Sequence, residues 1–160
     1  MYKRQDYWIV KIGFDGTIDW QKTIGGNGAD KARTIISQDD GGYILSGYSF
    51  SNESGEKSDN SFGSADFWII KIDNVGNILW DKTWGGNSAD ILIFESVNQK
   101  ANEDFVIAGT SSSNISGNKD EDSKGLDDFW VLNLGGGLNP STNINTVSYT
   151  HLTLPTICSE

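Results

Sequence analysis

The stretch DFWIIKI, residues Asp66–Ile72, is one of three similar copies of the same motif in the chain. It is preceded by DYWIVKI at Asp6–Ile12 and followed by DFWVLNL at Asp128–Leu134, so the tryptophans of the three copies are spaced by 60 and then 62 residues. The likeness extends beyond this core, because WQKTIGGN at Trp20–Asn27 recurs as WDKTWGGN at Trp80–Asn87. A period of this length indicates an array built from one supersecondary unit.

Each repeat is expected to contain four short strands separated by turns. In the first repeat, apolar and aromatic residues alternate or run together over residues 7–12, 18–24, 33–37 and 43–49, between clusters rich in Gly, Asp and Asn. Asp15 and Gly16 form a two-residue hairpin signal between the first two of these runs. The second repeat places the same runs at residues 67–72, 78–84, 92–97 and 105–110, and a third begins at residue 129. We therefore predict an all-β protein with one four-stranded antiparallel sheet per repeat.

Radial stacking of four-stranded antiparallel sheets produces the blades of a β-propeller. We expect residues 1–65 to form one blade, residues 66–127 a second, and residues 128–145 the start of a third, which makes about two blades plus one strand of an incomplete ring. A single twisted sheet cannot bury both faces, so each blade depends on its neighbours. We therefore expect the chain to be an internal piece of a longer repeat protein and to expose an apolar edge. A β-solenoid or a stacked sandwich is the alternative architecture.

The last residues, 146–160, break the repeat pattern. VSYTHLTLPT at residues 147–156 matches the conceptual translation of a transposon-end sequencing adapter over ten codons. We interpret this tail as a read-through artefact and exclude it from the fold; a genuine C-terminal strand is the alternative. The single histidine (His151) and the single cysteine (Cys158) both lie in this tail. The remaining chain therefore offers no Ser-His-Asp triad, no Cys nucleophile and no His/Cys zinc site.

The formal net charge is −10 at pH 7. An acidic chain repels nucleic acid phosphates and anionic membrane surfaces, so neither is an expected partner. No apolar run approaches the length of a transmembrane helix, and insertion into a membrane is not expected. Residues 1–5 have no apolar core of a signal peptide, which says nothing about the location of a longer parent protein.

The motifs D-[YF]-W-[IV]-[IV]-K-[IL] and W-x-K-T-x-G-G resemble the tandem "DYWIVK" propeller-type repeats of large secreted and surface proteins of Bacteroidetes-like bacteria. The resemblance covers about residues 6–134. It implies β-propeller blades and an extracellular or outer-membrane surface location, and many such proteins carry a type IX secretion sorting domain. Their labels include lipoprotein, lectin-like and endoglucanase-associated. The third copy departs from the pattern, with Asn133 where the others have Lys11 and Lys71.

Six tryptophans raise the question of a glycan-binding platform, since flat aromatic faces stack on sugar rings. Five of them lie inside strand runs at repeat spacing and are expected to pack between sheets: Trp8, Trp20, Trp68, Trp80 and Trp130. Trp84 differs, because Ile24 stands at its position in the first repeat and a Gly-Gly turn follows it. Trp84 is therefore the best single candidate for an exposed ligand platform, although packing in the core is the favoured interpretation.

An acidic loop over residues 113–128 contains the only candidate metal ligands. Asn118, Asp120 and Asp122 alternate as oxygen ligands do in calcium loops. The EF-hand pattern fails, because Ser123 stands where its Gly should be and Phe129 where its bidentate Glu should be. A solvated loop without metal is therefore the favoured interpretation, calcium binding is the alternative, and no other cofactor is predicted.

Paired carboxylates can hydrolyse glycosides, and four aspartates recur between the first two repeats: Asp6 with Asp66, and Asp30 with Asp90. Recurrence once per repeat favours a structural role instead, such as an Asx-turn or a cap on a strand end. We therefore predict no catalytic residue, and a binding or scaffolding role toward a glycan or protein partner at the loops between blades. The alternative is a non-catalytic repeat region of a secreted, endoglucanase-like polysaccharide-degrading enzyme or lipoprotein.

Overall fold

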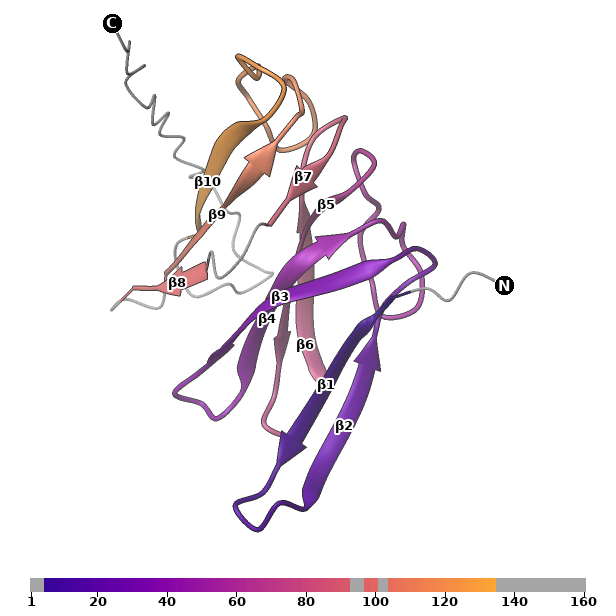
Figure 1. Cartoon of the computed structure of the whole chain (residues 1–160), viewed down its shortest axis with the longest axis vertical. Helices are drawn as coiled ribbons and strands as arrows, with labels where there is room; N and C mark the ends of the chain where they lie inside the picture. The colour runs from indigo at the N-terminus through magenta and orange to yellow at the C-terminus, as the bar shows by residue number, and fades with distance from the viewer. Residues whose placement is uncertain (1–4, 93–96, 101–103, 135–160) are drawn as a thin grey trace, which may run out of the picture.

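The computed structural model describes residues 5–92, 97–100 and 104–134, and every regular element in these ranges is a β-strand (Figure 1). The ten strands are β1 (Tyr7–Ile12), β2 (Ile18–Ile24), β3 (Asp30–Ser37), β4 (Tyr43–Ser49), β5 (Asp66–Ile72), β6 (Ile78–Trp84), β7 (Asp90–Ile91), β8 (Val97–Gln99), β9 (Phe105–Ser111) and β10 (Asp128–Leu134). The predicted all-β class is confirmed for this part of the chain. No helix in the same ranges could cross a membrane. The predicted end of the third repeat, residues 135–145, and the tail at 146–160 lie outside the described residues.

The strands form three antiparallel sheets that follow one another along the chain. The first sheet is the hairpin β1-β2, and the second has the order β3-β4-β5-β6. In the third sheet, β9 pairs with β10 on one side and with β7 and β8 on the other. The described strands do not close into a ring.

The hairpin turns are closed by a glycine and an aspartate. Gly16, between β1 and β2, has a φ of 83°, and Gly76, between β5 and β6, has a φ of 84°. Such positive φ values favour glycine because a Cβ would clash with the backbone. The carboxylate of Asp15 accepts a hydrogen bond from the Thr17 N–H at 3.0 Å and stabilises the first turn. The predicted hairpin at Asp15 and Gly16 is confirmed.

The prediction that each sheet contains the four strands of one repeat is wrong. The second sheet takes β3 and β4 from the first repeat and β5 and β6 from the second. Its central pairing joins β4 to β5 in continuous register, from Ser49 opposite Asp66 to Tyr43 opposite Ile72. The loop over residues 50–65 returns the chain beside β4, whereas the short turn over residues 25–29 takes the chain from the first sheet to the second. The sheet is therefore offset from the sequence repeat by two strands.

Two apolar cores lie on opposite faces of the second sheet. The first core joins the first and second sheets through buried residues of both: Tyr7, Ile24, Leu45, Trp68, Ile70 and Ile72. The second core joins the second and third sheets: Ile44, Phe67, Ile69, Trp84, Leu92, Phe105, Ile107, Trp130, Leu132 and Leu134. The three sheets therefore stack in series, face to face.

Strand β5 is buried on both faces, because successive side chains of a strand point to opposite sides. Phe67 and Ile69 enter the second core, whereas Trp68, Ile70 and Ile72 enter the first. All five side chains are fully buried. A strand covered on both sides has few solvent-facing positions, and in β5 only Lys71 is partly exposed, which explains why the repeated motif reads as a nearly continuous apolar run.

The third strand of each repeat differs from its predicted bounds. In the first repeat it begins at Asp30 instead of residue 33, because the backbone of Asp30–Ala32 pairs with Gly47–Ser49 before a bulge between Ala32 and Thr34. In the second repeat the sequence predicts one strand over residues 92–97. The structure has β7 and β8 on either side of residues 93–96, which lie outside the described residues.

Ile69 offers a test of the double-sided burial of β5. Ile69→Ala is expected to lower the free energy of unfolding by about 3 kcal/mol, since truncating a buried Ile to Ala costs roughly 2–5 kcal/mol. Urea denaturation followed by tryptophan fluorescence measures the change. Ile35 lies on the edge strand β3 and is 54% exposed, so Ile35→Ala is the control, with an expected change below about 0.5 kcal/mol. Equal effects of the two substitutions would contradict the placement of Ile69 in the core.

Candidate functional site

The aspartate that begins the third strand of each repeat holds the preceding Gly-Gly turn. The carboxylate of Asp30 accepts hydrogen bonds from the Gly26 N–H at 2.7 Å and from the Ser51 hydroxyl at 2.8 Å. In the second repeat, the carboxylate of Asp90 accepts the Gly86 N–H at 2.7 Å and the Ser113 hydroxyl at 2.8 Å. Asp30 and Asp90 are almost completely buried. The predicted structural role of these recurring aspartates is confirmed.

Serines of the long loops complete this polar network. The N–H of Asn27 donates to the hydroxyl of Ser54 at 2.8 Å, and the N–H of Asn87 donates to the hydroxyl of Ser116 at 2.8 Å. The β4–β5 loop is thus hydrogen-bonded to the β2–β3 turn, and the β9–β10 loop is hydrogen-bonded to the β6–β7 turn. The backbone N–H groups of both turns therefore find side-chain acceptors in the loops.

The close contact between loop and turn requires glycine. A Cβ on Gly26 would lie 2.6 Å from the Cβ of Ser51, and a Cβ on Gly86 would lie 2.6 Å from the Cβ of Ser113. Such distances are impossible without moving the backbone. The repeated Gly-Gly pair is therefore explained by packing against the loop, and a phosphate-binding role is not needed to account for it.

The aspartate that begins the DFWIIKI motif closes the same loop from its other end. The Oδ2 atom of Asp66 accepts hydrogen bonds from the N–H groups of Phe62, at 2.6 Å, and Gly63, at 3.3 Å. Asp128 accepts a hydrogen bond from the N–H of Lys124, the position equivalent to Phe62. Asp66 is fully buried, and its Oδ1 atom has no hydrogen-bond partner. Burial raises the pKa of Asp66 to about 6, although the two N–H donors act in the opposite direction.

Two buried lysines in the loops were not predicted as site residues. Lys57 is 2% exposed, and its ammonium donates to the Asp59 carbonyl and to the Thr83 hydroxyl, both at 2.6 Å. Lys119 is buried at the equivalent position, and its ammonium donates to the Ser113 carbonyl at 2.5 Å. Burial lowers the pKa of Lys57. The signal that could have identified both lysines is their recurrence two residues after the shared Ser-Gly pair in each loop.

The calcium candidates take part in the folding of their own loop. The carboxylate of Asp122 accepts a hydrogen bond from the Ile115 N–H at 2.9 Å, and the side-chain oxygen of Asn118 faces the Gly85 N–H at 3.4 Å. No interaction defines a role for Asp120. Within the described ranges, no group of three or more His, Cys, Asp or Glu side chains could hold a metal ion. The geometry gives the calcium prediction no support.

Trp84, the candidate for an exposed platform, is buried, and the favoured interpretation of this residue as a core tryptophan is confirmed. Trp84 is 5% exposed and lies in the second core. Ile24, at the same position of the first repeat, is 2% exposed and lies in the first core. The position is a core position in both repeats, and the larger indole fills the same kind of space between sheets.

The other tryptophans follow the prediction with one exception. Trp68 and Trp130 are buried in the first and second cores, and Trp20 and Trp80 pack half-buried against the same cores. Trp8, which the sequence places in the core, is 69% exposed. It lies on the face of the first sheet that no other described strand covers.

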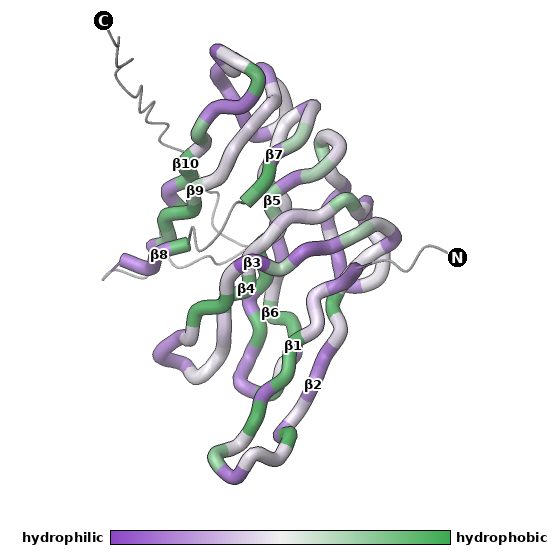
Figure 2. The backbone as a smooth tube through the Cα atoms, viewed as in Figure 1, coloured by the Kyte–Doolittle hydropathy of each residue, from purple (hydrophilic) through white to green (hydrophobic). Residues whose placement is uncertain are grey.

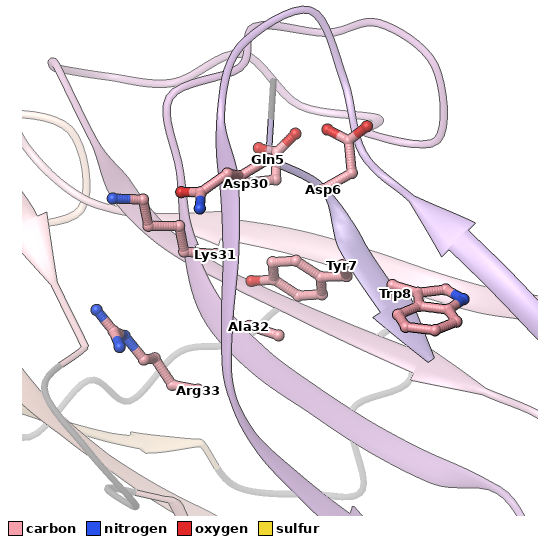
Figure 3. A pocket seen from close by; sticks show the side chains of 8 residues that line it. All are labelled: Gln5, Asp6, Tyr7, Trp8, Asp30, Lys31, Ala32 and Arg33. Atoms are coloured by element: carbon pink, nitrogen blue, oxygen red, sulfur yellow. The ribbon is translucent and has the colours of Figure 1, made fainter. Parts of the chain in front are cut away.

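An open cleft that combines charged and aromatic residues lies between the start of β1 and β3. Its volume is about 450 Å³. Figure 3 shows Asp6 and Asp30 near one end, Lys31 and Arg33 along β3, Tyr7 turned toward β3, and Trp8 turned away from it. The Tyr7 hydroxyl donates to the Trp68 carbonyl at 3.3 Å, and burial raises the pKa of Tyr7. Tyr7 is therefore a structural wall of the cleft.

One wall of this cleft is the free edge of a strand. In the second sheet, β5 pairs with β6 on one edge and with β4 on the other. In the first sheet, β1 pairs with β2, and no described strand pairs with its second edge. Strands with an open edge accept another extended chain through backbone hydrogen bonds. No protein-family model matches the chain, and no curated protein matches it.

The buried carboxylate of Asp66 predicts a pH-dependent stability. Because its pKa is about 6 in the folded protein, against 3.8 for an unperturbed aspartate, the folded chain binds more protons than the unfolded chain between these values. The free energy of unfolding is therefore expected to fall as the pH rises from about 4 to about 6, by up to roughly 3 kcal/mol. Urea denaturation at several pH values measures the slope, which Asp66→Asn should remove.

Asp73→Asn is the matched control for this slope. Asp73 lies in the exposed β5–β6 turn, where hydrogen bonds from Asn77 lower the pKa of its carboxyl. This carboxyl therefore titrates below the pH range over which Asp66 is expected to change the stability. The control variant should keep the slope of the unsubstituted chain. A stability that rises with pH between 4 and 6, or a slope that Asp66→Asn leaves unchanged, would show that Asp66 is not the group responsible.

Proposed function

We propose that the chain is a binding or scaffolding part of an extracellular β-propeller protein, and that its partner is a protein. Three antiparallel sheets stacked face to face, one of them a complete four-stranded meander, support the propeller architecture. The extracellular or outer-membrane location rests on the resemblance of the repeated motifs. The net charge of −10 favours a partner other than nucleic acid or an anionic membrane.

The use of the recurring polar residues supports a role without catalysis in this chain. The carboxylates of Asp30, Asp66 and Asp90 are engaged by backbone N–H groups of adjacent turns and loops. The ammonium groups of Lys57 and Lys119 are engaged by carbonyl and hydroxyl oxygens of the same loops. Our proposal assigns these side chains to the fold and places recognition on the exposed surfaces.

The observation that carries the proposal of a protein partner is the exposure of Trp8. Trp68 and Trp130 occupy the same motif position and are covered by a neighbouring sheet, whereas Trp8 is 69% exposed. The indole N–H of Trp8 donates to Gln21 at 3.3 Å, as that of Trp68 donates to Asp81 at 2.9 Å. The indole of Trp8 is therefore held within its own sheet by the same kind of hydrogen bond as the indole of Trp68, which a neighbouring sheet covers. A polypeptide surface is the partner that matches this arrangement.

A strand-addition experiment tests this proposal. A synthetic peptide with the β4 sequence, Tyr43–Ser49, is expected to pair with the free edge of β1 as β4 pairs with β5. Amide hydrogen exchange of Tyr7–Ile12 should slow on the edge opposite β2. The control is the same peptide with Ser46→Pro, which removes a backbone donor and cannot continue a ladder.

Neutral oligosaccharides provide the opposing test. We expect them to leave tryptophan fluorescence unchanged. If oligosaccharides instead change the fluorescence, Trp8→Ala removes the change, and the β4 peptide gives no protection, then the exposed indole is a sugar platform and the protein-partner proposal fails.

A further inference from the structure

The two ends of the stack of sheets expose apolar faces. The Trp8 face, on the first sheet, consists of Trp8, Val10 and Ile12 of β1; Trp8 is 69% and Ile12 61% exposed. The Phe129 face, on the third sheet, consists of Phe129 and Val131 of β10 with Val106 and Ala108 of β9; Phe129 is 63% exposed. Figure 2 shows hydrophobic residues along β1 and along the β9–β10 pair, which lie toward opposite ends of the molecule.

The repeat relates each of these faces to a face that is already buried. The Trp8 face corresponds to the side of β5 that carries Trp68, which contacts the first sheet. The Phe129 face corresponds to the side of β5 that carries Phe67, which contacts the third sheet. Each sheet thus has a tryptophan side and a Tyr or Phe side, and where two sheets meet, the Tyr or Phe side of one packs on the tryptophan side of the next.

The two internal contacts between sheets have similar separations between their aromatic rings. The ring of Tyr7 in the first sheet lies 5.1 Å from the ring of Trp68 in the second, and the ring of Phe67 in the second sheet lies 5.2 Å from that of Trp130 in the third. Backbone hydrogen bonds also recur between sheets, from the Asp30 N–H to the Gln5 carbonyl and from the Asp90 N–H to the Ala65 carbonyl. The same interface therefore forms twice within one chain.

We propose that a second copy of the chain docks head to tail, with the Phe129 face of one copy on the Trp8 face of the next and Phe129 against Trp8. This inference rests on the proposed protein-binding function and names the partner. The exposed faces are the two halves of an interface that the molecule already forms twice internally. Because the two faces differ, the contact is heterologous, and an open assembly of any size keeps one free Trp8 face and one free Phe129 face, at which it can grow into a filament or close into a ring.

The charge of the chain predicts how this association depends on salt. Each copy carries a net charge of −10, so two copies repel each other at long range, and salt screens this repulsion. The contact itself is apolar and aromatic. Association is therefore expected to strengthen as the salt concentration rises, the opposite of an interface held by ion pairs.

Mixing two single-face variants tests the proposal. Trp8→Glu blocks the Trp8 face and Phe129→Glu blocks the Phe129 face; both side chains are mostly exposed, so the fold should tolerate the changes. Analytical ultracentrifugation of the 160-residue chain should show concentration-dependent species larger than a dimer for the unsubstituted protein. Each variant alone should be monomeric, and a one-to-one mixture should form a heterodimer that grows no further.

Two further variants serve as controls for this experiment. Phe14→Glu changes a fully exposed aromatic residue in the β1–β2 turn and should assemble like the unsubstituted chain. The double variant Trp8→Glu/Phe129→Glu should remain monomeric in every mixture. Thermal melting of each variant verifies the fold. Assembly that weakens with salt would overturn the proposed contact.

Three further outcomes would overturn the inference: an unsubstituted chain that is monomeric at all concentrations and salts, a mixture of single-face variants that stays monomeric, or assembly that Trp8→Glu abolishes and Phe129→Glu leaves intact. The last result would indicate a symmetric contact between two Trp8 faces. The β4-peptide experiment separates these failures from failure of the protein-binding function, because strand addition to β1 needs no Phe129 face.

Discussion

The packing of a tryptophan from one sheet against the Tyr or Phe of the preceding sheet is the contact on which the fold depends. Trp68 packs on Tyr7, and Trp130 packs on Phe67. A sheet that carries large apolar side chains on both faces cannot satisfy them within itself, so each sheet needs a neighbour on either side. The second sheet has both neighbours, and six of the seven residues of its strand β5 are buried. The stability of such a stack therefore depends on the contacts between adjacent sheets.

The polar network at the ends of the strands complements these apolar contacts. In both repeats a buried aspartate, a Gly-Gly turn and a loop of serines interlock through the same hydrogen bonds. The residues on the outer surface of the loops differ between the repeats. Phe50 and Phe62 are partly exposed, and Ser112 and Lys124 stand at their positions in the next repeat. Keeping the inner contacts while varying the outer positions is what a binding scaffold requires, since loops on a rigid support carry specificity.

The proposed binding function rests on surfaces that resemble the interior of the molecule. Trp8 and Phe129 belong to faces whose counterparts are buried between sheets, and β1 has an edge whose counterpart on β5 is paired. The cleft between β1 and β3 lies at that edge and carries both carboxylates and cations. Recognition by a polypeptide requires only the two interactions that already hold the sheets together: backbone pairing at an edge and aromatic packing on a face.

The amino-acid sequence by itself determined the all-β class, the repeat, the hairpin turn at Asp15-Gly16 and the structural role of Asp30 and Asp90, because these depend on local conformation and on recurrence. Only the tertiary structure decided which strands share a sheet. The same sequence repeat is compatible with a sheet boundary at the long loop over residues 50–65 or at the short turn over residues 25–29, and the structure has the boundary at the short turn. It also decided which equivalent residues are buried. Trp84 is covered and Trp8 is not, although the repeat pattern singled out Trp84 as the candidate for exposure, because burial depends on whether a neighbouring sheet is present to cover the side chain.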